Sequence, residues 1–152
     1  MKYIFIVNPN SGNAKHDIQL DFLQSKFSSS DEISVKETAY QFHAKELVNE
    51  AIAEKADVIV ACGGDGTINE VASAMVNTKI PLGIIPAGSG NGLASNLAIP
   101  KDINKAIEII LKHNVHTIDV GRVEDKYFFS NLGFGIDAEV IKTYEENQKR
   151  TL

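Results

Sequence analysis

The amino-acid sequence predicts an α/β fold with three layers, in which helices cover both faces of a largely parallel sheet. Two observations lead to this prediction. Short apolar runs rich in β-branched residues alternate with segments whose apolar residues recur at helical spacing. In addition, glycine-rich loops follow two of these runs, at residues 63–66 and 87–92. Because ligands bind outside the carboxyl ends of the strands in open α/β sheets, we expect both loops to contribute to one site.

Four segments are predicted to be the strands of this sheet: Lys2–Val7, Ile33–Thr38, Asp57–Ala61 and Ile80–Pro86. The second alternates apolar and polar residues, which is typical of a strand with one buried face. The third is apolar and β-branched after its first residue, which suits a strand buried on both faces of a parallel sheet.

Between and after these strands lie segments with one apolar helical face each. The residues of these faces are Ile18, Phe22, Leu23 and Phe27; Leu47, Val48, Ala51 and Ile52; Ile68, Val71, Ala72, Met75 and Val76; and Ile103, Ala106, Ile107, Ile110 and Leu111. The alternation stops after Val115, where residues 116–123 and 126–131 are predicted to be two strands joined by a turn at Glu124–Asp125. A charged segment from Thr143 to Leu152 is predicted to be helical.

Composition limits the class of protein. A chain of 152 residues with 43% apolar content is long enough for one α/β domain with a real core. The net charge of −5 argues against nucleic acid as the main partner, because proteins that bind the phosphate backbone carry a basic face. The single cysteine, Cys62, excludes an internal disulfide and fits a reducing compartment, and no run approaches the roughly 18 apolar residues of a membrane span. We therefore expect a soluble, cytoplasmic protein.

The segment Cys62–Val71 is the most informative part of the chain. It is predicted to be a turn from a strand into a helix, with glycines at positions 63, 64 and 66 that allow positive φ angles and a close approach of the backbone to a ligand. The free N–H groups at the start of a helix favour an anion. The turn is not a Walker motif, because no Gly-Lys-Ser/Thr follows, and it is not the dinucleotide fingerprint. The segment therefore predicts a nucleotide-phosphate site of another kind.

Asp65 at the centre of this turn needs an explanation, because a carboxylate repels a phosphate. It is expected to bind a metal, to accept a proton or to position a main-chain amide. The alternative is an ordinary turn in which Asp65 caps the following helix and Gly66 relieves strain.

Three further loops fall at the predicted carboxyl edge of the sheet. Asn8 and the Ser11-Gly12 pair follow the first strand and could offer an amide and a hydroxyl to a nucleotide, or form a plain turn into a helix. Thr38 ends the second strand, and the nearby His43 is assigned no chemistry. Residues 87–92 form the second glycine-rich loop, in which Ser89 offers a hydroxyl and Asn91 can donate and accept hydrogen bonds.

In this order and spacing, three motifs resemble those of the diacylglycerol kinase and sphingosine kinase superfamily of lipid kinases. They are Asn8-Pro9 with Ser11-Gly12, Gly63-Gly64-Asp65-Gly66-Thr67 with Asn69-Glu70-Val71, and Pro86-Ala87-Gly88-Ser89-Gly90-Asn91. NAD kinases and phosphofructokinases carry similar central turns, but the NAD kinase pattern lacks the last block. The resemblance implies the N-terminal domain of the NAD kinase/diacylglycerol kinase-like fold.

The resemblance further implies that ATP and Mg²⁺ are bound, with phosphates on the central turn. Asp65 is the implied catalytic carboxylate that deprotonates the lipid hydroxyl, and no residue of this chain is assigned as a metal ligand. The implied nucleotide-binding residues are Asn8, Ser11, Gly12, Thr38, Gly63, Gly64, Asp65, Gly66, Thr67, Asn69, Glu70, Gly88, Ser89 and Asn91. The implied partners are ATP and a lipid with a free hydroxyl, together with a transient contact with the membrane.

The chain departs from the family in length, because such kinases are about twice as long and use a second, mostly β domain for the lipid. We therefore expect residues 1–130 to be the nucleotide-binding domain and residues 131–152 to begin the second domain, with no catalysis by this chain alone. Two alternatives remain: a kinase acting on another small molecule such as NAD, and a nucleotide-binding module without catalysis. The identity of the lipid and the oligomeric state stay open.

Overall fold

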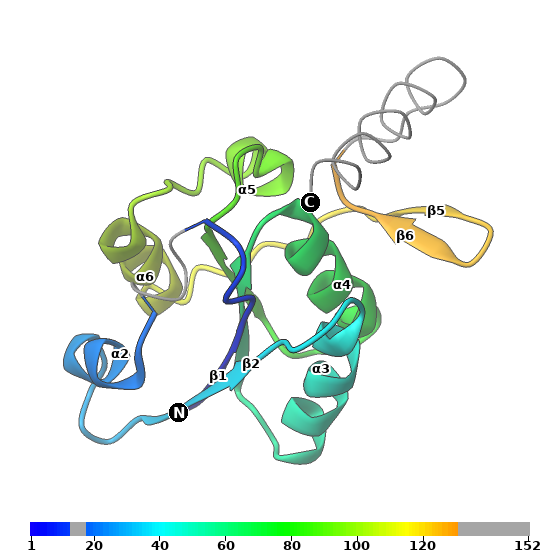
Figure 1. The fold of residues 1–152 in the computed structure, drawn as a ribbon. Helices are drawn as coiled ribbons and strands as arrows, with labels where there is room; N and C mark the ends of the chain where they lie inside the picture. The colour runs from blue at the N-terminus through cyan, green and yellow to red at the C-terminus, as the bar shows by residue number, and fades with distance from the viewer. Residues whose placement is uncertain (13–17, 131–152) are drawn as a thin grey trace.

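A computed structural model describes residues 1–12 and 18–130 of the chain. Within these residues, four parallel strands form one sheet in the order β2-β1-β3-β4 (Figure 1). The strands are β1 (Lys2–Val7), β2 (Glu32–Glu37), β3 (Val58–Gly63) and β4 (Leu82–Pro86). Each predicted strand is present, with ends that differ by one or two residues, and the predicted parallel sheet is confirmed.

Helices cover both faces of this sheet, so the predicted three layers are also confirmed (Figure 1). The helices are α2 (Leu20–Lys26), α3 (His43–Ala53), α4 (Asp65–Met75), α5 (Gly92–Asn96) and α6 (Ile103–Leu111). One core contains the buried residues of α3, α4 and α5, and the other contains those of α2 and α6. The predicted helical faces match most of these buried residues. The residues of those faces that are only half-buried are Phe22, Ile52, Val76, Ile103 and Leu111.

Strand β1 shows why the sheet is buried on both faces. Its alternate side chains Ile4 and Ile6 belong to the core under α3 and α4, whereas Tyr3, Phe5 and Val7 belong to the core under α2 and α6. The Tyr3 ring packs edge-on against the Phe27 ring, with centroids 4.7 Å apart. Because all five side chains are at most 1% exposed, each contributes about 1.5–3 kcal/mol of burial free energy.

The segment after α6 is less regular than predicted. Residues 114–120 have no regular secondary structure, and the hairpin that follows is short, with β5 (Gly121–Val123) paired antiparallel to β6 (Lys126–Phe128). The hairpin points away from the sheet (Figure 1), and an isolated pair of strands is only marginally stable. The strand predicted over residues 116–123 is therefore wrong for its first five residues. Residue 131 and the helix predicted over 143–152 lie outside the described residues.

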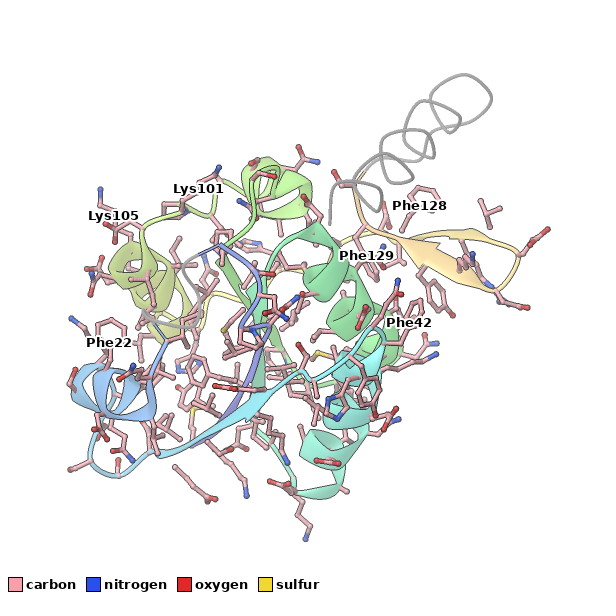
Figure 2. The ribbon with its side chains drawn as sticks, in the orientation of Figure 1. Phe22, Phe42, Lys101, Lys105, Phe128 and Phe129 are labelled. Carbon is pink, nitrogen blue, oxygen red and sulfur yellow. The ribbon has the colours of Figure 1, made fainter. Side chains whose placement is uncertain are left out.

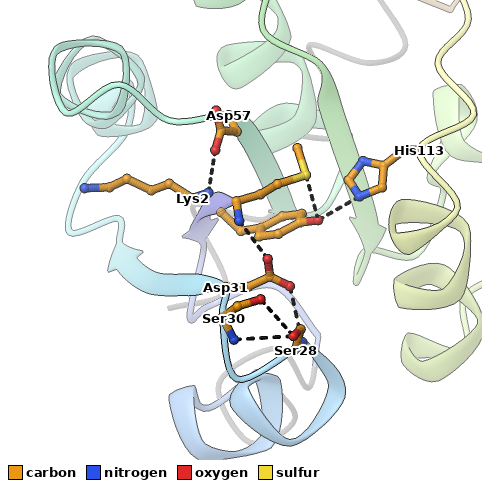
Figure 3. A network of polar contacts seen from close by, with 8 residues as sticks. Lys2, Ser28, Ser30, Asp31, Asp57 and His113 are labelled. Carbon is orange, nitrogen blue, oxygen red and sulfur yellow. Dashed lines mark hydrogen bonds and ion pairs between the residues drawn. The ribbon is translucent and has the colours of Figure 1, made fainter.

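A polar network lies at the amino end of the sheet (Figure 3). The backbone N–H of Lys2 donates to Asp57 Oδ2 at 2.7 Å, and the Tyr3 hydroxyl lies 2.8 Å from Nε2 of His113. Asp31 accepts from the Met1 ammonium at 2.7 Å and from the Ser28 backbone at 3.2 Å. These contacts join the loop after α2 and the end of α6 to the edge of the sheet opposite the glycine-rich loops.

Candidate nucleotide cleft

Four loops leave the carboxyl edge of the sheet side by side. Backbone hydrogen bonds continue past the strand ends: Asn8 N–H donates to Cys62 O at 2.9 Å, Thr38 N–H to Val7 O at 2.9 Å, and Ala87 N–H to Gly63 O at 2.8 Å. These bonds fix the starting points of the loops after β1, β2 and β4 relative to the end of β3. The sequence motifs that follow the four strands therefore meet at one edge.

The glycines of the central turn do not adopt the positive φ angles that were predicted. Gly64 is the N-cap residue of α4 with extended φ and ψ of −85° and −174°, and among the described glycines only Gly12 has a positive φ. The close approach of the two backbones instead requires glycine at position 88, because a Cβ on Gly88 would lie 2.6 Å from Gly64 Cα, whereas a Cβ on Gly64 would lie 3.4 Å from Gly88 Cα, an ordinary contact. The second glycine-rich loop thus packs directly on the central turn.

Asp65 connects these two loops. Its Oδ2 accepts the backbone N–H of Asn91 at 2.7 Å and its Oδ1 accepts the backbone N–H of Gly92 at 2.6 Å. Gly92 is the first residue of α5, so Asp65 supplies the negative charge that a helix N-terminus favours. Of the roles predicted for this carboxylate, the structure shows the positioning of main-chain amides. The alternative in which Asp65 caps its own helix is wrong, since the N-cap of α4 is Gly64 and the Asp65 carboxylate bonds the amides of Asn91 and Gly92 instead.

Asn91 holds the second loop in shape. It is 1% exposed, it has a left-handed backbone with φ of 57°, and its side chain accepts from Gly88 N–H at 2.9 Å and donates to Gly88 O at 2.6 Å. The side-chain amide of Asn91 therefore forms its hydrogen bonds within the loop. Ser89 is exposed on the same loop, and the ammonium of Lys101, on the segment between α5 and α6 (Figure 2), donates to its carbonyl at 3.0 Å.

The first loop reaches the central turn from the other side. Ser11 Oγ accepts the backbone N–H of Gly64 at 3.3 Å, and the amide of Asn8 donates to Thr67 Oγ1 at 3.0 Å. Gly12 has φ of 53°, and a Cβ there would collide with the carbonyl oxygen of Ala87. The structure thus brings together the predicted residues of all three motifs.

A cleft of about 300 Å³ opens where these loops meet. Its lining residues are Asn8, Asn10, Thr38, Ala39, Tyr40, Gln41, Gly66, Thr67 and Glu70. Five of them are among the predicted nucleotide-binding residues. The other four, Asn10 and residues 39–41, were missed, although residues 39–41 directly follow Thr38 in the sequence. The predicted residue Asn69 lies outside the cleft, on an exposed part of α4 where its side chain accepts from Ser73 at 2.9 Å.

The other predicted residues do not line the cleft, and most of them take part in the contacts between loops described above. They are Ser11, Gly12, Gly63, Gly64, Asp65, Gly88, Ser89 and Asn91. In the described residues no group of three or more His, Cys, Asp or Glu side chains is arranged to hold a metal ion. Cys62 is fully buried at the end of β3, and burial raises the pKa of its thiol, so it is not a reactive group of this site.

A larger, mostly apolar groove of about 630 Å³ runs beside the edge strand β4, between α4, α6 and residues 113–118. It contains none of the predicted site residues. Within the part of the chain that the structure describes, no helix has the length and apolar character needed to cross a bilayer.

Comparison with known proteins identifies the family. A family model described as the diacylglycerol kinase catalytic domain matches residues 2–123. The chain is 35% identical over 148 residues to a diacylglycerol kinase of Bacillus subtilis. This alignment covers 95% of this chain and 48% of that protein. It is 41% identical over 107 residues to a protein of Yersinia enterocolitica named "Probable lipid kinase YegS-like". This second alignment covers 68% of this chain and 36% of that protein.

Comparison with solved structures gives the same family. A crystal structure of a diacylglycerol kinase from Bacillus anthracis superposes with a TM-score of 0.70 and 30% sequence identity, over 84% of this chain and 45% of the other. The chain spans about half the length of these relatives or less. Its sequence motifs, its sheet and its matched residues together show that it belongs to the diacylglycerol kinase catalytic domain family.

Proposed function

We propose that this chain is the ATP-binding half of a lipid kinase that transfers the γ-phosphate of ATP to a lipid hydroxyl, of diacylglycerol or of a sphingoid-type lipid. The observation that carries the proposal is the cleft at the start of α4, because residues of the first motif and of the central turn line the same cavity. The names of the relatives support a kinase acting on lipid.

In this proposal the phosphates of ATP lie against the N-terminus of α4. The first bond from the start of this helix runs from Ile68 N–H to Gly64 O, so the preceding N–H groups of the first turn have no acceptor within the helix. Together with the helix dipole they favour an anion at this end. Gly66 and Thr67 line the cleft there, which gives the phosphates access to these donors.

Asp65 is proposed to act in two ways. By accepting the amides of Asn91 and Gly92 it holds the second glycine-rich loop on the central turn. A carboxylate offers about four lone-pair positions, so the two amide bonds leave room for Asp65 to accept a further proton from a lipid hydroxyl. In phosphoryl transfer such a group orients the attacking alcohol, and most of the catalysis is positioning and charge neutralisation.

Mg²⁺ is proposed to enter with ATP. Magnesium in kinase sites is held by one or two carboxylates together with phosphate oxygens and water. The described part of the site offers Asp65 beside the turn and Glu70 in the cleft, which fits an ion carried mainly by the phosphates. When bound, the ion would neutralise charge on the transferred phosphoryl group.

The lipid pocket is proposed to belong to the part of the relatives that this chain does not span. We therefore expect weak ATP binding and no turnover by these 152 residues. The test has two stages. Calorimetry with Mg²⁺–ATP measures binding to this chain, and radiolabelled ATP with diacylglycerol, sphingosine or NAD measures turnover by a longer protein that includes it.

Phosphorylation of a lipid by the longer protein would support the proposal. Phosphorylation of NAD without lipid would identify a small-molecule kinase instead. ATP binding by the longer protein without any turnover would identify a nucleotide-binding module. A robust lipid-kinase rate from this chain alone would contradict the proposal that the lipid pocket lies in the part of the relatives that this chain does not span.

A further inference from the structure

The loop between β2 and α3, residues 38–42, forms a wall of the cleft that the motifs do not account for. Thr38, Ala39, Tyr40 and Gln41 line the cavity together with Gly66, Thr67 and Glu70 of α4. If the phosphates lie at the start of α4, the rest of a nucleotide must occupy space beside this loop. The chemistry of the loop therefore bears on how the nucleoside is held.

Tyr40 presents an aromatic ring in this wall. One side of the ring stacks on the imidazole of His43, with centroids 4.4 Å apart and an interplanar angle of 15°. The hydroxyl donates to Glu46 Oε2 at 2.9 Å. The residue nevertheless stays 56% exposed, so a large part of the ring is open to a ligand.

Hydrogen bonds donated by Ala39 and Phe42, on either side of Tyr40 in the loop, hold this segment in place. The Ala39 N–H donates to Nδ1 of His43 at 3.0 Å, which fixes the imidazole under the Tyr40 ring. On the other side, Phe42 has a left-handed backbone with φ of 70°, and its N–H donates to Glu70 Oε1 at 3.2 Å. Because Glu70 belongs to α4 and also lines the cleft, this bond sets the spacing between the two walls.

We infer that Tyr40 is the stacking platform for the nucleobase in this cleft and that His43 is its positioning residue. The inference rests on the proposed function and assigns the nucleoside end of the ligand to residues outside the family motifs. A flat π-system stacks favourably on an aromatic ring, and a ring already fixed from behind loses little freedom when a base binds.

This arrangement also predicts limited discrimination between bases. Stacking uses the face of a base, which all nucleobases share, rather than the hydrogen-bonding edge that distinguishes them. Tyr40 should therefore add affinity for ATP and GTP alike.

The test compares Tyr40→Ala, Tyr40→Phe and Phe42→Ala in calorimetric titrations of the 152-residue chain. Phe42 (Figure 2) is the matched control, because it is an aromatic residue of the same loop, is 63% exposed and does not line the cleft. The alanine variant of this residue keeps the backbone N–H that bonds Glu70. The ligands are Mg²⁺–ATP, Mg²⁺–GTP and Mg²⁺–tripolyphosphate, which has phosphates but no base.

Tyr40→Ala should weaken both nucleotides about tenfold, the scale of one base–aromatic contact, and leave tripolyphosphate unchanged. Tyr40→Phe keeps the ring and loses only the bond to Glu46, so its affinity should stay within about twofold of the unmutated chain. Phe42→Ala should change nothing. Thermal unfolding should be similar for all variants, because both side chains are largely exposed.

Two results would overturn the inference while the proposed function stands. The first is an unchanged ATP affinity in Tyr40→Ala. The second is a loss of tripolyphosphate affinity in Tyr40→Ala as large as the loss of ATP affinity, which would mean that Tyr40 only supports the loop. No ATP binding by the unmutated chain, with or without tripolyphosphate binding, would contradict the proposed function itself.

Discussion

Asp65 and Asn91 are joined across the two glycine-rich loops by a 2.7 Å hydrogen bond from the Asn91 backbone N–H to Asp65 Oδ2. The second carboxylate oxygen takes the next N–H, that of Gly92, at 2.6 Å. One side chain therefore ties the start of α4 to the start of α5, and any ligand held by both loops depends on this pair of bonds.

Asp65→Asn should loosen the second loop. An amide offers only one acceptor oxygen, so one of the two N–H groups would face the NH₂ group and lose its partner, at a cost of roughly 1–2 kcal/mol. Hydrogen exchange measured by NMR should be faster at the amides of Asn91 and Gly92. Asp102→Asn is the control, because Asp102 accepts the Lys105 N–H at the start of α6, away from these loops. Unchanged exchange in Asp65→Asn would mean that the two bonds do not hold the loop.

Asn91 combines a left-handed backbone with a side chain that bonds Gly88 twice. Asn91→Gly removes the side chain but tolerates φ of 57°, whereas Asn91→Ala removes the side chain and keeps a Cβ in a strained conformation. We expect both variants to lose roughly 1–3 kcal/mol from the free energy of unfolding in urea, because a buried N–H and a carbonyl lose their partner. The alanine variant should be the less stable by about 1 kcal/mol. Equal stability of the two would show that the backbone conformation relaxes.

Gly66→Ala should separate ligand binding from folding. A Cβ at this position meets nothing within 4 Å, and Gly66 lies in the first turn of α4, where alanine is the better helix former by up to about 1 kcal/mol. The melting temperature should therefore stay the same or rise. A methyl group on the lining of the cleft should nevertheless hinder phosphates that approach the backbone, and calorimetry should show weaker Mg²⁺–ATP binding.

Gly88→Ala is the contrasting variant, since its Cβ would lie 2.6 Å from Gly64 Cα. It should lose stability and affinity together. If Gly66→Ala bound Mg²⁺–ATP as well as the unmutated chain does, the phosphates would not lie on the first turn of α4.

Cys62 should be protected in the folded protein. Its side chain is fully buried, and the loss of hydration raises the pKa of the thiol above its ordinary value of 9.0. Reaction with a thiol reagent at pH 8 should be roughly 100-fold or more slower in buffer than in guanidinium chloride, because it requires opening of the sheet.

The sign of the accompanying pH effect follows from the same shift. A thiol whose pKa is higher in the folded state favours folding fully below pH 9.0, and this contribution is lost as the pH rises further. Denaturant midpoints between pH 8 and 10 should therefore fall more for the unmutated chain than for Cys62→Ala. An equal fall in both would show that other groups cause it.

Local sequence was sufficient to predict the sheet. Runs such as Asp57–Ala61 are too apolar for an exposed strand, and the helical faces after each strand supply the layers that cover them. The same reasoning failed for residues 116–120, which were predicted to belong to a strand, but no neighbouring strand pairs with them among the described residues. Pairing depends on the rest of the fold and cannot be deduced from the segment alone.

The site was predicted only in part, because its contacts also depend on segments that are distant in the sequence. Residues beside Asp65 in sequence were expected to share its function, but the amides it binds belong to Asn91 and Gly92, 26 and 27 positions away. The glycines of the central turn were attributed to positive φ and to a close approach of the backbone to a ligand. None of them has a positive φ, and the close backbone contact that requires glycine is that of Gly88 on Gly64. Thr38 placed the loop after β2 at the carboxyl edge, but Tyr40 was missed because nothing in the local sequence indicates which side chains of this loop face α4 across a cleft.

The central claim, that the start of α4 receives the phosphates of a nucleotide, is tested most directly by NMR with the ¹⁵N-labelled chain. Titration with Mg²⁺–ATP should shift the amide signals of Gly66 and Thr67 first, together with those of Asn8 and Thr38, while amides beside the apolar groove at β4, such as Leu82, stay unchanged. Shifts confined to that groove, or no shifts at millimolar ATP, would contradict the claim.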